Sequence, residues 1–304
     1  MLSFLLTNKV TQGPAKNKGN KNNQGFFVED ADTSPSEWGG RFEKIRMKLL
    51  VPVRRENRIV LGVAFFIVFV ALWSFLSLSG AVPRHFLATP WQTVVSGWNL
   101  FATQGFSHDV GMTIWRVVGG FVLAAVIAVP LGIAMGVYKP VEAFFEPFVS
   151  FARYLPASAF IPLLILWVGI GEAQKLTVIF IGCFFQLTLM ITMIVSGTRR
   201  DLVEAAYTLG CRDTGVIRRV VLPGAAPEIA EALRQVLGLG WTYIIVAELI
   251  GASSGIGHMI TDSQALMATD HIIAGIVVIG LVGLLSDLAF KKVNQHLFSW
   301  SLLR

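Results

Sequence analysis

Long apolar stretches dominate the chain from residue 59 onward, and several of them contain no charged residue. A helix that crosses a bilayer core about 30 Å thick needs about 20 apolar residues. Four stretches of about this length carry no charge, and two shorter ones are bounded by charged or titratable side chains. The shorter two can span if the side chains at their ends reach the membrane interface. The pattern predicts an all-α polytopic membrane protein with six transmembrane helices over residues 59–83, 117–138, 155–171, 176–198, 235–247 and 272–286.

Composition agrees with a membrane protein. Only 14% of the residues are charged and 54% are hydrophobic, whereas about 25% of an average soluble domain is charged. So few charges cannot cover a soluble body, which excludes a disordered protein, a nucleic-acid binder and most soluble enzymes. The net charge of +6 indicates an anionic membrane surface as the partner. The two cysteines, Cys183 and Cys211, give neither a disulfide framework nor the spacing of a metal site.

The N-terminal residues differ from the rest of the chain. Residues 1–40 are polar and rich in glycine and asparagine, which is typical of a disordered extension. The segment 41–57 alternates basic and apolar residues at helical spacing, as a helix on a membrane surface does. A solvated linker that merely orients the first span is the alternative. Residues 58–298 are predicted to form the membrane domain, and residues 299–304 a short cytosolic tail.

Basic residues are divided unevenly between the two sides of the predicted spans. Of the 25 lysines and arginines, 21 lie in four segments on one side, 1–58, 139–153, 199–228 and 291–304. Cytoplasmic loops of membrane proteins carry an excess of Lys and Arg, so these segments are expected in the cytosol. Both termini are therefore predicted to be cytosolic.

The cytosolic loop 199–228 is long and carries several helix signals. Asp201 can cap a helix, because a glutamate follows three positions later. Gly210 supplies a stop, since glycine tolerates the left-handed conformation at a helix C-terminus. Asp213 can cap a second short helix that ends at Pro223. The loop is thus predicted to be two short helices hinged at the glycine.

The loop also contains a spaced motif. Glu204-Ala205-Ala206 is followed after three residues by Gly210, and after nine more by Val-Val-Leu-Pro at 220–223. This motif resembles the EAA loop of ABC importer permeases, with Val220 where isoleucine is commoner. The resemblance implies that six residues couple the chain to an ATPase: Glu204, Ala205, Ala206, Gly210, Leu222 and Pro223.

Two further stretches indicate a particular branch of these permeases. Residues 153–171 and 240–260 are similar to the nitrate, sulfonate/taurine and bicarbonate branch of these permeases, and the likeness covers residues 59–298. It implies a type I ABC importer permease in a bacterial inner membrane, carrying a small anion or sulfonate. A second permease copy, two ATP-binding subunits on the cytosolic side and an extracytoplasmic binding protein are the implied partners. ATP and Mg would bind the ATPase, and this chain would bind no cofactor.

The family resemblance also gives the loop a mechanism. In such permeases it is a coupling helix that docks into a groove of the ATPase. Ala205 and Ala206 are small enough for close seating, and Glu204 offers a carboxylate to a basic residue of the partner. Closure of two ATPases would move two loops and rock the spans by alternating access.

Other activities have less support. The chain has no G-x-x-x-x-G-K-[ST] phosphate loop, so its energy must come from another chain. An ATP-independent secondary transporter or channel is the alternative, but it gives no reason for the loop 199–228. A glycine-rich stretch, GASSGIG at 251–257, resembles a nucleotide turn of dehydrogenases. It follows a predicted span instead of a strand, with no Tyr-x-x-x-Lys pair downstream, so an outward bend or re-entrant turn is favoured.

Polar residues on the spans are candidates for a translocation path. Gln186 can alternatively join helices by hydrogen bonding. Glu248 and Asp287 can be interfacial anchors or partners of Arg116 and Arg234. An arginine before the third span can attract anions to the inner mouth, or simply follow the positive-inside rule. The candidates are Gln186, Thr188, Thr192, Thr242, Tyr243, Glu248 and Arg153.

Overall fold

The computed structural model describes residues 55–80, 82–83 and 86–300. The predicted extension 1–40, most of the predicted surface segment 41–57 and most of the tail 299–304 lie outside the described residues. Helices and loops account for all of the described part, and it contains no β-strand. This confirms the prediction of an all-α chain.

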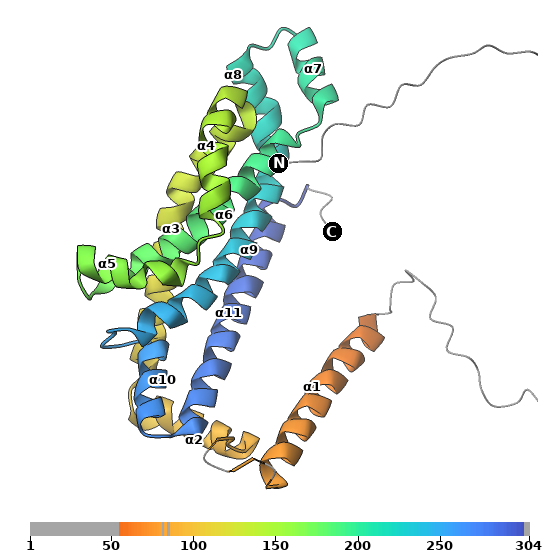
Figure 1. Cartoon of the computed structure of the whole chain (residues 1–304). Coiled ribbons are helices and arrows are strands. Elements are labelled where there is room, and N and C mark those ends of the chain that lie inside the picture. The colour runs from red at the N-terminus through yellow and green to blue at the C-terminus, as the bar shows by residue number, and fades with distance from the viewer. Residues whose placement is uncertain (1–54, 81, 84–85, 301–304) are drawn as a thin grey trace, which may run out of the picture. The chain divides into compact units, whose positions relative to one another are not determined.

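The helices follow one another with short connections (Figure 1). In chain order they are α1 Arg55–Leu78, α2 Pro90–Thr103, α3 Phe106–Val137, α4 Lys139–Ala152, the 3-10 turn η1 Ala157–Phe160, α5 Ile161–Val168, α6 Glu172–Ser196, α7 Arg200–Thr208, α8 Asp213–Val216, the π-turn η2 Ile217–Val221, α9 Leu222–Leu249, α10 Ile256–Ala265 and α11 Thr269–Leu297.

Five of the described helices are long and apolar enough to cross a membrane, α1, α3, α6, α11 and the continuous helix Asp213–Leu249. A sixth span is obtained if the bent pair Lys139–Ala152 and Ala157–Val168 counts as one. The predicted fold class is therefore confirmed, although the third predicted span, 155–171, contains only the second part of this pair.

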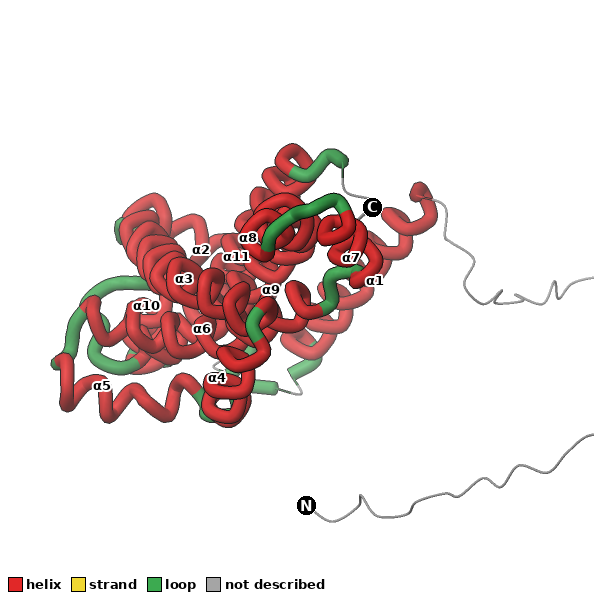
Figure 2. Tube along the Cα trace, turned by 90° about the horizontal axis from the view of Figure 1, so that it is seen from above, coloured by secondary structure: helices red, strands yellow, loops and turns green. Residues whose placement is uncertain are grey.

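The bend in this pair follows from its sequence. The two parts meet at an angle of 84°, and Pro156 between them has an extended backbone. A proline disfavours helical backbone at the residue before it, here Leu155, so the helix does not run on from α4 into Ala157. Figures 1 and 2 show α5 projecting to one side of α4 and α6.

Small residues let the central helices approach closely. An added Cβ on Gly120, Gly132 or Gly136 of α3 would lie within 2.6–2.8 Å of a side chain on α6. Helices in membranes associate through such small-residue contacts, because burial from lipid gives little hydrophobic driving force. α6 packs in turn against α9, so α3, α6 and α9 form the core that positions the polar residues below.

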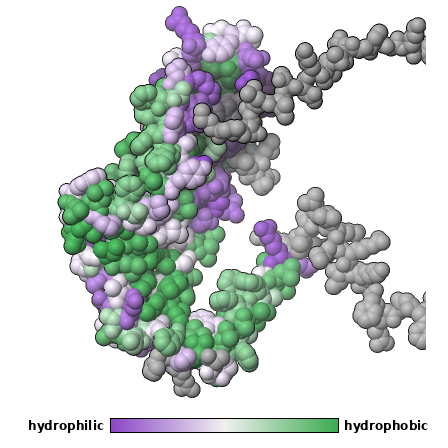
Figure 3. Space-filling view, in the orientation of Figure 1, coloured by the Kyte–Doolittle hydropathy of each residue, from purple (hydrophilic) through white to green (hydrophobic). Residues whose placement is uncertain are grey.

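The outer surfaces of the described helices are strongly apolar. Phe65 and Phe66 of α1 are 67% and 68% exposed, and Leu166 of α5 is 82% exposed. Figure 3 shows hydrophobic surface over much of the helices and hydrophilic surface around α7. This arrangement suits a protein whose helices face lipid and whose loops face water.

Candidate functional site

The loop between α6 and α9 is a helical hairpin made of α7 and α8. Gly210 ends α7 with a positive φ of 81°, as predicted. The Cys211 N–H donates to the Ala206 carbonyl at 3.0 Å, and the Gly210 N–H donates to the Tyr207 carbonyl at 2.9 Å. These two bonds form a Schellman motif, which satisfies the last carbonyls of the helix. The Tyr207 hydroxyl also bonds Asp213 of α8 at 3.1 Å, which raises the pKa of this tyrosine.

The predicted cap of α7 is wrong. Asp201 is the second residue of the helix, Arg199 precedes the helix, and no side chain caps its N-terminus. The Arg199 guanidinium donates to the Asp201 carboxylate, with 3.2 Å between Nε and Oδ1. This contact holds the pKa of Asp201 below its usual range. The main partner of this carboxylate is therefore Arg199, and the backbone N–H groups of Leu202 and Asp201 contribute less.

The predicted end of the second helix at Pro223 is also wrong. The chain stays helical from Asp213 to Leu249. The π-turn Ile217–Val221 lies just before the proline, and a wider turn of this kind absorbs local irregularity inside a helix. In a regular helix the proline ring would clash with the carbonyl four residues earlier, and the wider turn relieves this clash, so the helix continues beyond Pro223.

The hairpin exposes most of its motif and the side chains of two leucines. Glu204 and Ala205 are exposed, whereas Ala206 is only 6% exposed and packs with the core. Leu202 lies four residues before Ala206 and Leu209 three residues after it, so both are on the same side of the helix as Ala206. They are nevertheless 48% and 85% exposed. Sequence reasoning missed these two leucines. It identified the motif, but it could not show that α8 leaves this side of α7 largely uncovered.

A buried ion cluster joins α3, α6 and α9 toward the other end of the helices. Arg116 of α3 is fully buried and donates five hydrogen bonds. Two reach the Glu172 carboxylate, one reaches Glu248 at 2.7 Å, and two reach the carbonyl and hydroxyl oxygens of Ser254. All five guanidinium donors are thus satisfied. The predicted pairing of Glu248 with Arg116 is confirmed, as is that of Asp287 with Arg234, at 2.8 Å.

The glycine-rich stretch 251–257 wraps this cluster. It connects α9 to α10, so the predicted turn is confirmed, and a helix precedes it where a nucleotide turn would follow a strand. The Gly257 N–H donates to Glu248 at 2.9 Å. A Cβ on Gly255 would lie 2.5 Å from the Glu248 carboxyl carbon and 2.6 Å from the Arg116 guanidinium. The glycines therefore let backbone approach a buried ion pair.

Three of the predicted path residues meet at one small cavity. Arg153, Gln186 and Tyr243 line a space of about 50 Å³ between the end of α4, α6 and α9. Gly182 makes room for the tyrosine, because a Cβ there would lie 2.4 Å from the Tyr243 ring. No acidic residue lines this cavity. A guanidinium, an amide and a phenol all donate hydrogen bonds, which suits an anion.

The structure does not bring the other path candidates to this cavity. The hydroxyls of Thr188, Thr192 and Thr242 donate to carbonyls of their own helices at 2.7–2.8 Å. Thr188 and Thr192 are buried, and Glu248 belongs to the ion cluster. Their assignment to a path stays a prediction.

Comparison with known proteins decides the family. The model of the family described as binding-protein-dependent transport system inner membrane component matches residues 128–299, more than half of the chain. The chain belongs to this family. Its members are ABC-transporter permeases, which are transport components and not enzymes.

Two relatives and one solved structure illustrate the match. The permease is 30% identical over 260 residues to the taurine transport system permease protein TauC of Escherichia coli (strain K12), covering 84% of this chain and 94% of that protein. It is 31% identical over 258 residues to a protein named as an aliphatic sulfonates transport permease, SsuC, of Bacillus subtilis (strain 168), covering 85% and 92%. A structure of the inward-facing MetNI methionine ABC transporter matches with a TM-score of 0.57 at 20% identity, covering 63% of this chain and 95% of that chain. This last likeness shows the fold.

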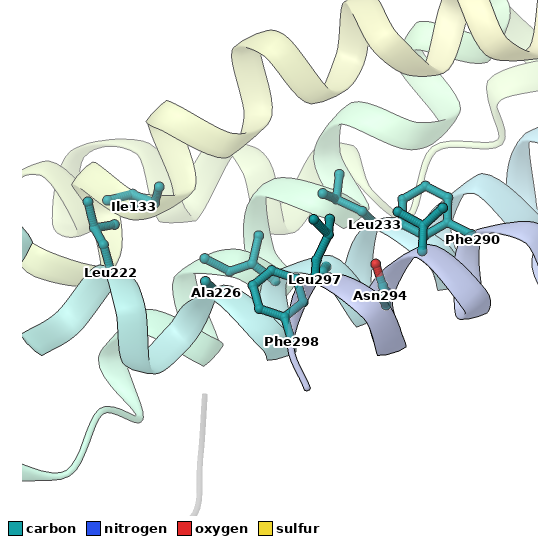
Figure 4. Close-up of a pocket in the computed structure, with 11 residues that line it drawn as sticks. Ile133, Leu222, Ala226, Leu233, Phe290, Asn294, Leu297 and Phe298 are labelled. Atoms are coloured by element: carbon teal, nitrogen blue, oxygen red, sulfur yellow. The ribbon is translucent and has the colours of Figure 1, made fainter. Parts of the chain in front are cut away.

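A larger cavity of the permease has different chemistry. It has a volume of about 430 Å³ and lies between α3, α9 and α11 (Figure 4). Apolar side chains line it, Leu222 of the motif among them, and Asn294 is its polar residue. A polar solute would find little hydrogen bonding there, so this cavity is less suited to an anion than the one at Tyr243.

Proposed function

We propose that this permease forms the membrane path of an ATP-driven importer and is moved by a separate ATPase through the α7–α8 hairpin. The observation that carries this proposal is the exposed surface of α7. It combines the Glu204 carboxylate, the small Ala205 and the uncovered side chains of Leu202 and Leu209. An apolar stripe beside a charge on a short exposed helix suits a groove on a protein partner.

The helix that follows the hairpin can transmit its motion. Asp213–Leu249 is a continuous helix of 37 residues, about 55 Å long at 1.5 Å per residue. Gly210 joins it to α7, and its far end carries Glu248 of the buried ion cluster. A displacement of α7 therefore reaches the opposite end of the molecule as movement of one rigid element. Two copies moved in this way would expose the path alternately to each side.

The cargo we propose is a small oxyanion or sulfonate, such as nitrate, bicarbonate, taurine or another alkanesulfonate. Relatives named for taurine and aliphatic sulfonates support this class. The cavity lined by Arg153, Gln186 and Tyr243 supports it as well, because it offers donors and no carboxylate. We assign these three residues to the path.

The assembly follows from the same proposal. Two permease copies pair in the inner membrane, with both termini in the cytosol. Two subunits that bind ATP and Mg dock against the hairpins, and an extracytoplasmic binding protein delivers the solute. An ATP-independent transporter would leave the exposed stripe of α7 unexplained.

Co-purification with the ATPase encoded beside this chain tests the proposal. Glu204→Lys should reduce complex formation and substrate-stimulated ATP hydrolysis at least tenfold, because it replaces an attractive charge by a repulsive one. Membrane insertion should stay unchanged, because Glu204 is exposed. Asp262→Lys is the control, since it reverses an exposed carboxylate on α10, outside the hairpin. Failure of the wild-type chain to bind the ATPase would overturn the proposal and favour the channel or secondary transporter.

A further inference from the structure

The Glu172 carboxylate occupies the guanidinium fork of Arg116. Its two oxygens accept from Nε at 2.7 Å and from Nη2 at 2.6 Å, and Lys175 Nζ lies 3.5 Å from Oε1. A planar oxyanion binds arginine by the same pair of parallel hydrogen bonds. The carboxylate therefore stands where a nitrate, carboxylate or sulfonate group would bind.

Burial differs sharply between the carboxylate and its cations. The side chains of Arg116 and Lys175 are 0% and 3% exposed, whereas that of Glu172 is 46% exposed. A half-exposed glutamate at the start of a helix can rotate into solvent, but the buried cations are fixed by packing. The hydrogen bonds of Arg116 to Glu248 and Ser254 do not involve Glu172, so they can hold the guanidinium in place without it.

The charges of the Arg116 cluster would be balanced by one monovalent anion if Glu172 moved away. Arg116 and Lys175 carry two positive charges, and Glu172 and Glu248 carry two negative charges. Rotation of Glu172 into water leaves one uncompensated positive charge in a buried place, which is strongly unfavourable without a counterion. A monovalent oxyanion restores the balance. Asp109 adds a further carboxylate nearby, where it accepts the Gly255 N–H at 2.7 Å, but among the described residues it forms no ion pair with Arg116 or Lys175.

An unpartnered amide lies on the same helical turn. Gln174 is fully buried, and neither its amide nitrogen nor its amide oxygen has a hydrogen-bond partner among the described residues. No side chain caps the first N–H groups of α6, which begins at Glu172. A buried amide without a partner is unfavourable, because it has lost its hydrogen bonds to water. An anion beside this turn would supply the missing acceptor and also face the positive end of the helix dipole.

We propose that the start of α6 is an oxyanion site which Glu172 closes when no anion is bound. Arg116, Lys175 and Gln174 hold the anion, and Glu172 acts as the carboxylate that the anion displaces. The inference rests on the proposed function, because the orientation proposed for the spans places this turn on the extracytoplasmic side, where the binding protein delivers its solute. The site lies on α6 far from the hairpin, and its ligand is the cargo or an anion of the same chemistry.

The test uses the purified permease–ATPase complex and measures the Kd for sodium nitrate and for sodium ethanesulfonate by calorimetry, in a chloride background. Glu172→Gln removes the competing charge, so its complex should bind at least one of the two anions about tenfold more tightly than wild type. Adding Lys175→Met should abolish this gain. Glu142→Gln is the matched control, because Glu142 forms the same kind of pair with Lys139, three residues away at the start of α4. It should bind like wild type.

A second variant keeps every charge. Gln174→Leu in the Glu172→Gln background should weaken binding several-fold, because it removes one hydrogen bond to a charged ligand. A Glu172→Gln complex that binds neither anion more tightly than wild type, whether it stays folded or unfolds, would show that the glutamate is a structural partner only and would overturn the site. The same samples report ATPase association, so failure of the site with the complex intact leaves the proposed function standing.

Discussion

Glycine is required at two positions of this permease for two different physical reasons. At Gly210 the requirement is conformational, because φ is 81° and no atom lies within 4 Å of an added Cβ. At Gly132 it is space, because a Cβ would lie 2.8 Å from both the Ile191 Cβ and the Thr188 carbonyl oxygen on α6. A side chain can rotate away, but a helical carbonyl cannot. Contacts with backbone are therefore the ones that exclude any larger residue.

The contrast between two helical glycines gives a prediction at this scale. Gly132→Ala should lower the free energy of unfolding by about 1–3 kcal/mol, because overpacking separates α3 from α6. Gly280→Ala in α11 meets no atom within 4 Å, and alanine is the better helix former, so this control should be neutral or slightly stabilising. Thermal unfolding of the purified chains compares them. Equal midpoints for the two variants would contradict the close α3–α6 contact.

At the scale of elements, ion pairs connect helices that are distant in sequence. Arg116–Glu248 links α3 to α9 with both side chains fully buried. Arg234–Asp287 links α9 to α11 with side chains 21% and 42% exposed, and Arg234 has a second partner in Glu231. Each arginine has a second carboxylate, Glu172 for Arg116 and Glu231 for Arg234, but only the second pair is open to water that can replace a lost partner. The two pairs therefore differ in how much they stabilise the fold.

Removing one carboxylate from each pair measures this difference. Glu248→Ala should destabilise the permease by about 3–5 kcal/mol, since it leaves a buried arginine undercompensated and frees the N–H of Gly257. Asp287→Ala should change stability by less than about 1 kcal/mol, because Glu231 still holds Arg234. Unfolding midpoints in one detergent compare the two variants. A larger loss for Asp287→Ala would show that exposure does not govern these pairs.

The elements also show what a sequence can predict. Charge-free apolar runs located α1, α3 and α6, because lipid-facing helices need no charges. The fifth and sixth spans were predicted too short, since Arg234 and Asp287 were taken as ends, whereas they neutralise each other inside longer helices. The third was predicted over 155–171, whereas the helix there is only Ala157–Val168 and completes a span only together with α4, from which Pro156 separates it.

The candidate site was predictable to a similar degree. The motif and Gly210 follow from local spacing, and charge pairing suggested Arg116 with Glu248. The role of Glu172 could not be predicted, because it is 56 positions from Arg116 and only the packing of α3 on α6 brings them together. Likewise, the exposure of Leu209 depends on how little of α7 the rest of the hairpin covers.

At the scale of the whole molecule, the ties between helices determine which parts move together. The α3–α6–α9 core, the ion cluster and the turn 251–257 join into one unit, and α2 packs on α11 beside it. The hairpin is tied to this unit as well, because Ala206 of α7 and Val216 of α8 pack in the same core and α8 continues into α9. Alternating access of a paired permease should therefore be motion of one copy, hairpin included, against the other, with little rearrangement between α2 and α11 of one chain.

A crosslink within one chain tests this rigid-body view. The Cβ positions of Gly97 on α2 and Ala274 on α11 are 3.7 Å apart, within the range of about 3.5–4.5 Å that a disulfide requires. In a Cys211→Ser background, Gly97→Cys with Ala274→Cys should oxidise readily, while Cys183 stays inaccessible because it is buried. Vesicles carrying the oxidised importer should keep most of their substrate uptake, with each single-cysteine variant as a control. Uptake that stops on oxidation and returns with reductant would show that α2 and α11 separate during transport, and the unit that moves would then be smaller than one chain.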